Sequence, residues 1–141
     1  MKVSKRVSII ANICLLLWFT LDMTGLYFGD KYLVARSYAD DGIFFVIYAA
    51  AFALFLFKDK IGKIILSIWL AMWFVTQFMS HWWFTIFGGG EGKIQYFDGA
   101  VKIIESNDIY IPDLYHIVLH ILILAAFICT LLYRRADIKE N

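Results

Sequence analysis

The sequence predicts an all-α integral membrane protein in which four transmembrane helices form a bundle. Apolar side chains make up 62% of the residues and charged side chains only 18%, a proportion that a water-soluble domain of this length cannot bury. The charges lie between long uncharged runs and not within them. Since each unpaired backbone group in lipid costs several kcal/mol, these runs are expected to be helical. We treat residues 1–141 as a single transmembrane domain.

Four apolar runs supply the predicted helices. At about 1.5 Å per residue, roughly 20 residues cross the roughly 30 Å hydrocarbon layer. The predicted spans are residues 7–29, 43–57, 64–87 and 114–133. The second run is short, so it must tilt little or recruit flanking residues to cross the bilayer. Pro112 followed by Asp113 is predicted to cap the start of the fourth helix.

The distribution of lysine and arginine predicts the orientation in the membrane. Nine of these residues fall on one side of the predicted bundle, namely Lys2, Lys5, Arg6, Lys58, Lys60, Lys63, Arg134, Arg135 and Lys139. The other side has four, Lys31, Arg36, Lys93 and Lys102. Because cytoplasmic loops carry the excess of positive charge, both termini are expected in the cytoplasm. The chain is thus predicted to be a multi-pass protein of the plasma membrane.

The long outer loop, residues 88–113, is predicted to contain a short amphipathic helix. It opens with a glycine-rich and flexible exit from the third helix, formed by Gly88, Gly89, Gly90 and Gly92. Apolar residues then recur at helical spacing, at Ile94, Phe97, Val101 and Ile104. This spacing predicts a helix over 94–105 that lies on the outer membrane surface or caps the bundle. An ordered loop without a ligand is the alternative.

Four ionisable residues within the spans are the candidates for function. Asp22 lies on the first predicted helix, His81 on the third, and His116 and His120 on the fourth. Such groups are costly in lipid, so they normally face the bundle interior and mark a functional site. With about 1.5 Å per residue, Asp22, His81 and His120 fall roughly 10 Å below the outer ends of their helices. Three helices therefore bring an ionisable group to one level.

The neighbours of these residues predict a polar pocket in the outer half of the bundle. Asp113, His116 and His120 have i, i+3 and i+7 spacing and form one polar stripe. Gln77, Ser80 and His81 share a second stripe on the third helix. Gln77, Ser80 and Asp113 are thus expected to line the pocket beside the ionisable groups.

The pocket is a candidate site for a divalent transition metal such as zinc. A histidine pair at i and i+4, with a third histidine and a carboxylate, supplies ligands for zinc, iron, copper or nickel: His116, His120, His81 and Asp22. Haem fits less well, because two axial histidines would leave the third unexplained. The other readings are a buried hydrogen-bond network without a ligand and a site for a proton-linked or small-solute ligand.

Three functional classes follow from this pocket. The leading one is a protein without demonstrable catalysis that binds a metal ion or a small molecule, or acts as a sensor or accessory subunit. The second is a membrane redox or metal-dependent enzyme that uses His81, His116 and His120. The third is a component of a small-solute or proton-linked transporter. The expected partners are the lipid bilayer, a second copy or another membrane protein, and a small ligand, with no nucleic acid.

Overall fold

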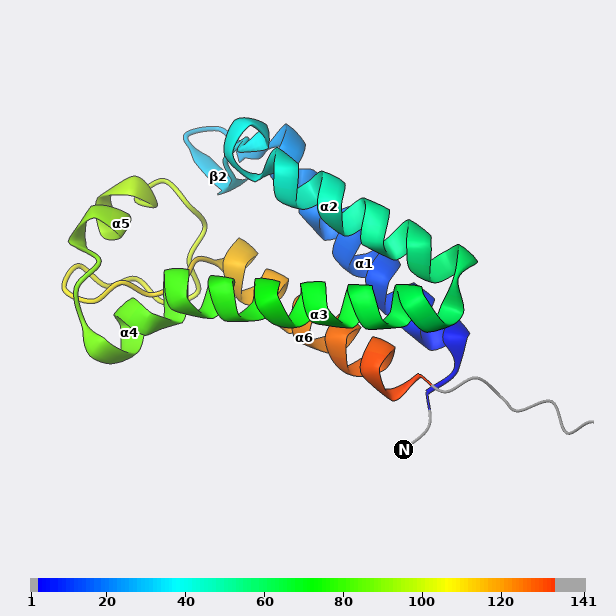
Figure 1. The fold of residues 1–141 in the computed structure, drawn as a ribbon. Coiled ribbons are helices and arrows are strands. Elements are labelled where there is room, and N and C mark those ends of the chain that lie inside the picture. Colours follow the sequence, from blue (N-terminus) through cyan, green and yellow to red (C-terminus); the bar gives the residue numbers. More distant parts are fainter. Residues whose placement is uncertain (1–2, 134–141) are drawn as a thin grey trace, which may run out of the picture.

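The computed structural model describes residues 3–133, and among them four helices are long and apolar enough to cross a membrane. These are α1 (Lys5–Thr24), α2 (Tyr38–Phe57), the rod Asp59–Phe87 and α6 (Leu114–Leu132). The rod consists of α3 (Asp59–Gln77), the π-helical turn η1 (Phe78–Trp82) and α4 (Trp83–Phe87). Each of α1 and α3 packs against both α2 and α6, so the helices surround one core (Figure 1). The predicted four apolar spans are confirmed.

The first helix is shorter than predicted and a β-hairpin follows it. Gly25 ends α1 at Thr24, because its φ of 74° leaves the helical region and its N–H donates to the Leu21 carbonyl at 2.7 Å. Strands β1 (Leu26–Phe28) and β2 (Lys31–Val34) then pair antiparallel. The prediction of a helix over 7–29 is therefore wrong for its last turn, since hydropathy alone does not separate an apolar strand from a helix.

The second helix begins earlier than predicted, which gives it the length to span a membrane. It starts at Tyr38 and not at residue 43, and is 20 residues long. Its first turn contains Asp40 and Asp41, whose charges favour a helix N-terminus. After the turn at Lys58, the backbones of α2 and α3 approach so closely that a Cβ at Gly62 would lie 2.3 Å from Phe55 Cα.

The helix in the loop 88–113 lies at a different place from the predicted one. The loop contains α5 over Glu91–Tyr96, and residues 97–105, predicted to be helical, form turns and irregular structure. The backbone there pairs with the hairpin: Tyr32 N–H donates to the Gly99 carbonyl at 3.1 Å, and Val101 N–H donates to the Tyr32 carbonyl at 2.9 Å. These long-range bonds replace helical ones, so the prediction of a helix over 94–105 is wrong from residue 97 onward and correct only for 94–96.

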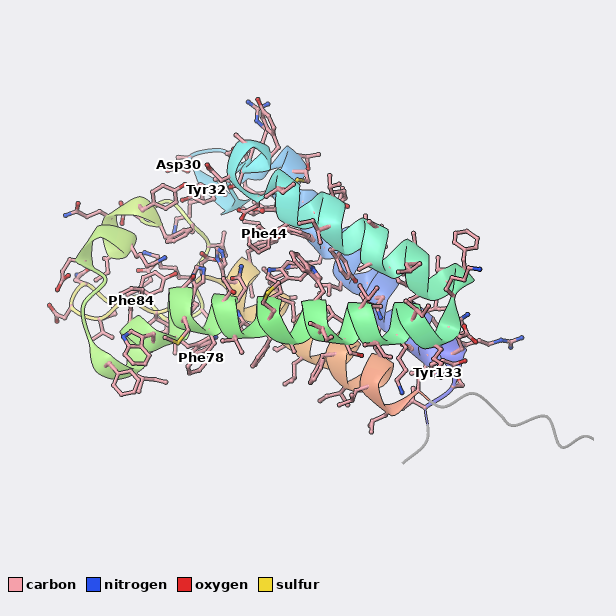
Figure 2. All side chains as sticks on the ribbon, viewed as in Figure 1. Asp30, Tyr32, Phe44, Phe78, Phe84 and Tyr133 are labelled. Carbon is pink, nitrogen blue, oxygen red and sulfur yellow. The ribbon has the colours of Figure 1, made fainter. Side chains whose placement is uncertain are left out.

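The two ends of the bundle differ in structure. Val3 and Tyr133 form a β-bridge, so both ends of the described chain lie together at what we call the terminal end (Figures 1 and 2). The hairpin and α5 lie at the opposite end, which we call the hairpin end (Figure 1). At the terminal end Lys5 forms an ion pair with Asp59. Four residues used to predict the orientation, Lys2, Arg134, Arg135 and Lys139, lie outside the described residues.

Polar side chains join three helices inside the half of the bundle near the terminal end. Asn12 of α1 donates to Thr130 Oγ1 of α6 at 3.0 Å, and Tyr48 of α2 donates to Asn12 Oδ1 at 3.0 Å. Ser8 lies 3.1 Å from Thr130, hydroxyl to hydroxyl. We call these four residues the Asn12 network. They are fully buried, so water does not compete for their hydrogen bonds, which stabilise the contacts among the helices.

Candidate functional site

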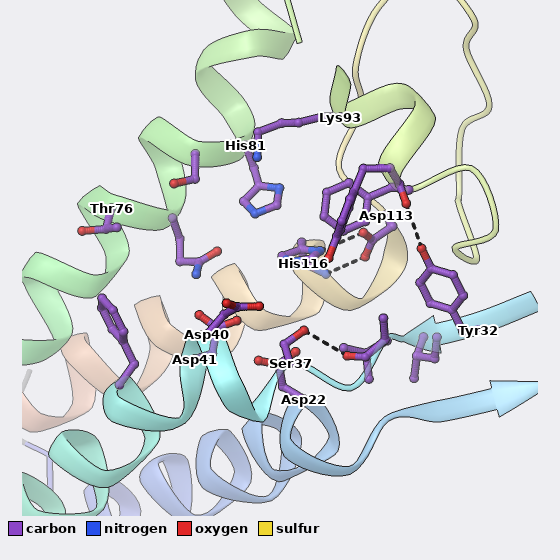
Figure 3. A pocket seen from close by; sticks show the side chains of 18 residues that line it. Asp22, Tyr32, Ser37, Asp40, Asp41, Thr76, His81, Lys93, Asp113 and His116 are labelled. Carbon is purple, nitrogen blue, oxygen red and sulfur yellow. Dashed lines mark hydrogen bonds and ion pairs between the residues drawn. The ribbon is translucent and has the colours of Figure 1, made fainter. Parts of the chain in front are cut away.

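A polar cavity of about 320 Å³ lies at the hairpin end of the bundle (Figure 3). Four carboxyl groups line it, from Asp22, Asp40, Asp41 and Asp113. Two imidazoles and one ammonium group join them, from His81, His116 and Lys93. Of the predicted lining residues, Gln77 and Ser80 face the same cavity. Residues from all four spans, the hairpin and α5 therefore form its wall.

Asp22, Asp40 and Asp41 form the acidic side of the cavity. The Ser37 N–H donates to the Asp22 carbonyl oxygen at 2.8 Å, which attaches the start of α2 to the end of α1. This bond places the first turn of α2, with its two aspartates, beside Asp22. The side chains of Asp22 and Asp41, from two different helices, therefore line the same cavity.

Sequence reasoning missed Asp40 and Asp41 because it assigned them to the loop before the second helix. The structure places them in the helix itself, on the cavity. The signal that identifies them is positional, since two acidic residues directly before an apolar run are typical of a helix N-terminus. That signal predicts a longer second helix, and with it a carboxyl group near Asp22.

Asp113 and His116 form a carboxylate–imidazole pair at the start of α6. Asp113 is the N-cap residue, as predicted, and its Oδ1 accepts the His116 N–H at 3.0 Å. Its Oδ2 lies 2.8 Å from His116 Nδ1. Because a carboxylate only accepts, Nδ1 carries the hydrogen, and Nε2 of the neutral ring has a free lone pair. The pair resembles a base whose orientation is held by an acid, which is common in proton-transfer sites.

His81 lies on the π-helical turn η1 and stacks on His116, with ring centroids 4.0 Å apart. Its Nδ1 lies 2.5 Å from the hydroxyl of Tyr110. Burial and the negative charge of Asp113 raise the pKa of Tyr110, so its phenol stays protonated. The phenol therefore donates to His81 Nδ1, and the hydrogen of the ring is on Nε2. π-helical turns are frequent at functional sites.

His120 is separated from the cavity. Its Nδ1 lies 2.6 Å from the His116 carbonyl oxygen, and its ring contacts Phe74 and Trp82 edge to face. It lines an apolar groove on the outer surface of the bundle, beside Ile121 and Leu124. The structure thus brings Asp22, His81 and His116 to one cavity, whereas His120 does not line it. The ring centroids of His120 and His81 are nevertheless only 6.1 Å apart.

The residues predicted as metal ligands are divided between the cavity and the groove. Among residues 3–133, no group of three or more histidine, cysteine, aspartate or glutamate side chains has the arrangement of a metal site. Hydrogen bonds engage Nδ1 in each of the three histidines, through Tyr110, Asp113 and the His116 carbonyl.

Lys93 and Tyr32 contribute to the cavity from outside the spans. Lys93, on α5, holds its Nζ within 6 Å of three ring centroids: 5.6 Å for Phe84, 5.7 Å for Tyr110 and 5.9 Å for Phe97. Burial lowers the pKa of Lys93. Tyr32 donates to the Tyr96 carbonyl at 3.2 Å, which joins β2 to α5 above the cavity. Burial, and then Asp113, raise the pKa of Tyr32.

Sequence reasoning did not identify Tyr32, Lys93 or Tyr110 as site residues, because no local pattern distinguishes them in their loops. Only the contacts of the hairpin and of residues 88–113 bring Tyr32 and Lys93 to the cavity and Tyr110 to His81. The chain has no match among models of protein families, curated proteins or solved structures, so the chemistry of the cavity is argued from its geometry.

Proposed function

We propose that this chain is a multi-pass plasma-membrane protein, with both termini in the cytoplasm, that binds a small organic molecule with an ammonium group in its cavity. The orientation rests on the excess of lysine and arginine at the terminal end across the whole sequence. In this orientation the cavity opens toward the outer face of the membrane. The protein then acts as a binding or sensor subunit for a molecule outside the cell.

The observation that supports this function is the collection of four carboxyl groups in one partly enclosed cavity with a single lysine. Low-dielectric walls strengthen the field of such a group, so a cation is attracted and held. The rings of Tyr32, Phe44 and Tyr96 also face the cavity, and aromatic faces bind organic cations. A volume of about 320 Å³ fits a small molecule better than a bare ion.

The Asn12 network does not favour a transport pathway through one copy of the chain. Asn12, Thr130 and Tyr48 fill the centre of the bundle between the cavity and the terminal end with hydrogen-bonded, fully buried side chains. A solute would have to break these bonds to cross. A site that opens at one end only is what a binding or sensing function needs.

The test is titration calorimetry of the full chain, purified in detergent, with ethanolamine and butylamine as probes. The wild type is expected to bind at least one of the amines. Asp41→Asn, which removes one charge from the acidic side, is expected to weaken this binding at least tenfold, about 1.4 kcal/mol. Asp108→Asn makes the same change at an exposed loop position outside the cavity and should leave binding unchanged.

Thermal melting of both variants checks that each is folded before the binding data are compared. Absence of binding heat with every ammonium compound tested, the amino-carboxylates named below included, would contradict the proposed function. Equal weakening by Asp41→Asn and Asp108→Asn would also contradict it, because the effect would then come from net charge and not from the cavity.

A further inference from the structure

The cavity has two sides of opposite character. Lys93 and His81 lie on one side (Figure 3). The opposite side carries the carboxyl groups of Asp22, Asp40 and Asp41 (Figure 3). The separation matters because a ligand with one positive charge needs only the acidic side. The basic side is then left without a role.

The ammonium group of Lys93 lacks an anionic partner within the protein. Among residues 3–133, no carboxylate forms an ion pair with it, although its side chain is half-buried among aromatic rings. A partly desolvated cation is stabilised when an anion is brought to it. His81 lines the same side of the cavity as Lys93 (Figure 3). Its Nε2–H is a second donor on this side.

A buried polar atom in the cavity wall also lacks a partner. Gln77 Oε1 is inaccessible to solvent and accepts no hydrogen bond from any described residue. Gln77 lies on α3 and lines the cavity. A buried acceptor without a donor costs free energy until a ligand or water supplies the donor.

We propose that the ligand of the cavity is a small zwitterion, an amino-carboxylate, whose ammonium group binds Asp22, Asp40 and Asp41 and whose carboxylate binds Lys93. This inference rests on the proposed function and specifies its ligand class. The ammonium donates to the carboxyl groups, and the carboxylate accepts from Lys93 and from His81 Nε2. The ligand thus adds no net charge to a site that already contains both signs.

The experiment compares zwitterionic probes with probes that carry one charge. The full chain in detergent is titrated at pH 7 with glycine, 4-aminobutyrate and 6-aminohexanoate, which differ in the spacing of the two charges. Butylamine and butyrate are the matched probes with one charge each. At least one amino-carboxylate is expected to bind ten or more times more tightly than butylamine.

Substitutions at Lys93 assign this preference to the basic side. Lys93→Met keeps the length of the side chain and removes its charge. The variant should therefore bind the amino-carboxylate and butylamine with about equal affinity. Its affinity for butylamine should stay within about twofold of the wild-type value. Lys93→Arg keeps the charge and should retain part of the preference. Lys102→Met is the matched control, because Lys102 lies in the same loop but does not line the cavity.

The outcomes separate this inference from the proposed function. If butylamine binds as tightly as every amino-carboxylate, the zwitterion is excluded and amine binding stands. If Lys93→Met keeps the preference, or weakens both kinds of probe equally, the role of Lys93 is excluded and amine binding again stands. If neither amines nor amino-carboxylates bind the folded wild type, both proposals are overturned.

Discussion

The imidazole rings of His81 and His116 stack in the cavity wall, with centroids 4.0 Å apart and planes inclined by 29°. One ring comes from η1 and the other from α6, so the stack joins two spans at the hairpin end. Each ring has its Nδ1 engaged, by Tyr110 for His81 and by Asp113 for His116. Two positively charged rings at this distance would repel each other, so the contact favours at most one charge on the pair.

Replacing Tyr110 with phenylalanine removes the donor to His81 and changes little volume. Because His81 is only 5% exposed, its Nδ1 is left without a partner, and we expect a loss of about 1–3 kcal/mol in unfolding free energy. Denaturant unfolding in detergent measures this loss. Tyr96→Phe is the control, since the Tyr96 side chain is exposed. Equal stability of the two variants would show that the bond between Tyr110 and His81 contributes nothing.

Asn12→Leu tests the Asn12 network. Leucine is similar in size but removes the bonds of the Asn12 amide to Thr130 and Tyr48, so we expect a loss of about 1–2 kcal/mol, the upper range for hydrogen bonds between membrane helices. Thr130 keeps its contact with Ser8, and Tyr48 keeps its bond to the main-chain carbonyl of residue 12. Ser67→Ala is the matched control. The Ser67 hydroxyl is buried without a hydrogen-bond partner among the described residues, so its removal should be neutral or stabilising. If Ser67→Ala destabilises the protein as much as Asn12→Leu, burial and not hydrogen bonding is responsible.

Gly62→Ala tests the contact between the backbones of α2 and α3. The added Cβ would lie 2.3 Å from Phe55 Cα, and backbone atoms cannot give way as a flexible side chain does. The helices must separate, and we expect a loss of about 1–3 kcal/mol. Gly42→Ala, in α2, places its Cβ in open space and should stabilise the helix slightly. The midpoint temperature of thermal unfolding should therefore be higher for Gly42→Ala than for the wild type, and lower for Gly62→Ala.

The stability of the protein should depend on pH through Lys93. Burial lowers its pKa below the ordinary value of 10.5. Between the lowered pKa and 10.5 the unfolded chain binds more protons at this site than the folded chain, so the Lys93 contribution to stability rises with pH. Lys93→Met removes this contribution. The free energy of unfolding of the wild type should therefore increase relative to that of Lys93→Met as the pH rises toward 10.5. A difference between the two proteins that does not change with pH would contradict the burial of the charge.

Local properties of the sequence were sufficient for the spans and for one cap. Apolar length predicts a helix that can cross lipid, because lipid forces each backbone group to bond within its own segment. The N-cap at Asp113 was predictable for a similar reason, since its acceptor bonds lie within three residues. The stripe that joins Asp113 to His116 also followed from helical spacing. These features require no knowledge of how the helices pack.

The sequence by itself determined that four apolar helices exist and that Asp22, His81, His116 and His120 are polar groups near one end of them. Only the tertiary structure decided which of these groups meet. The rotation of α6 places His116 in the cavity and His120 in the groove, and this rotation depends on side chains from several helices packed together. The pairing of Tyr32 with residues 99–101 likewise joins the hairpin to the loop that supplies Lys93 to the cavity and Tyr110 to His81. Such contacts join segments far apart in the chain, so local hydropathy and spacing carry no signal for them.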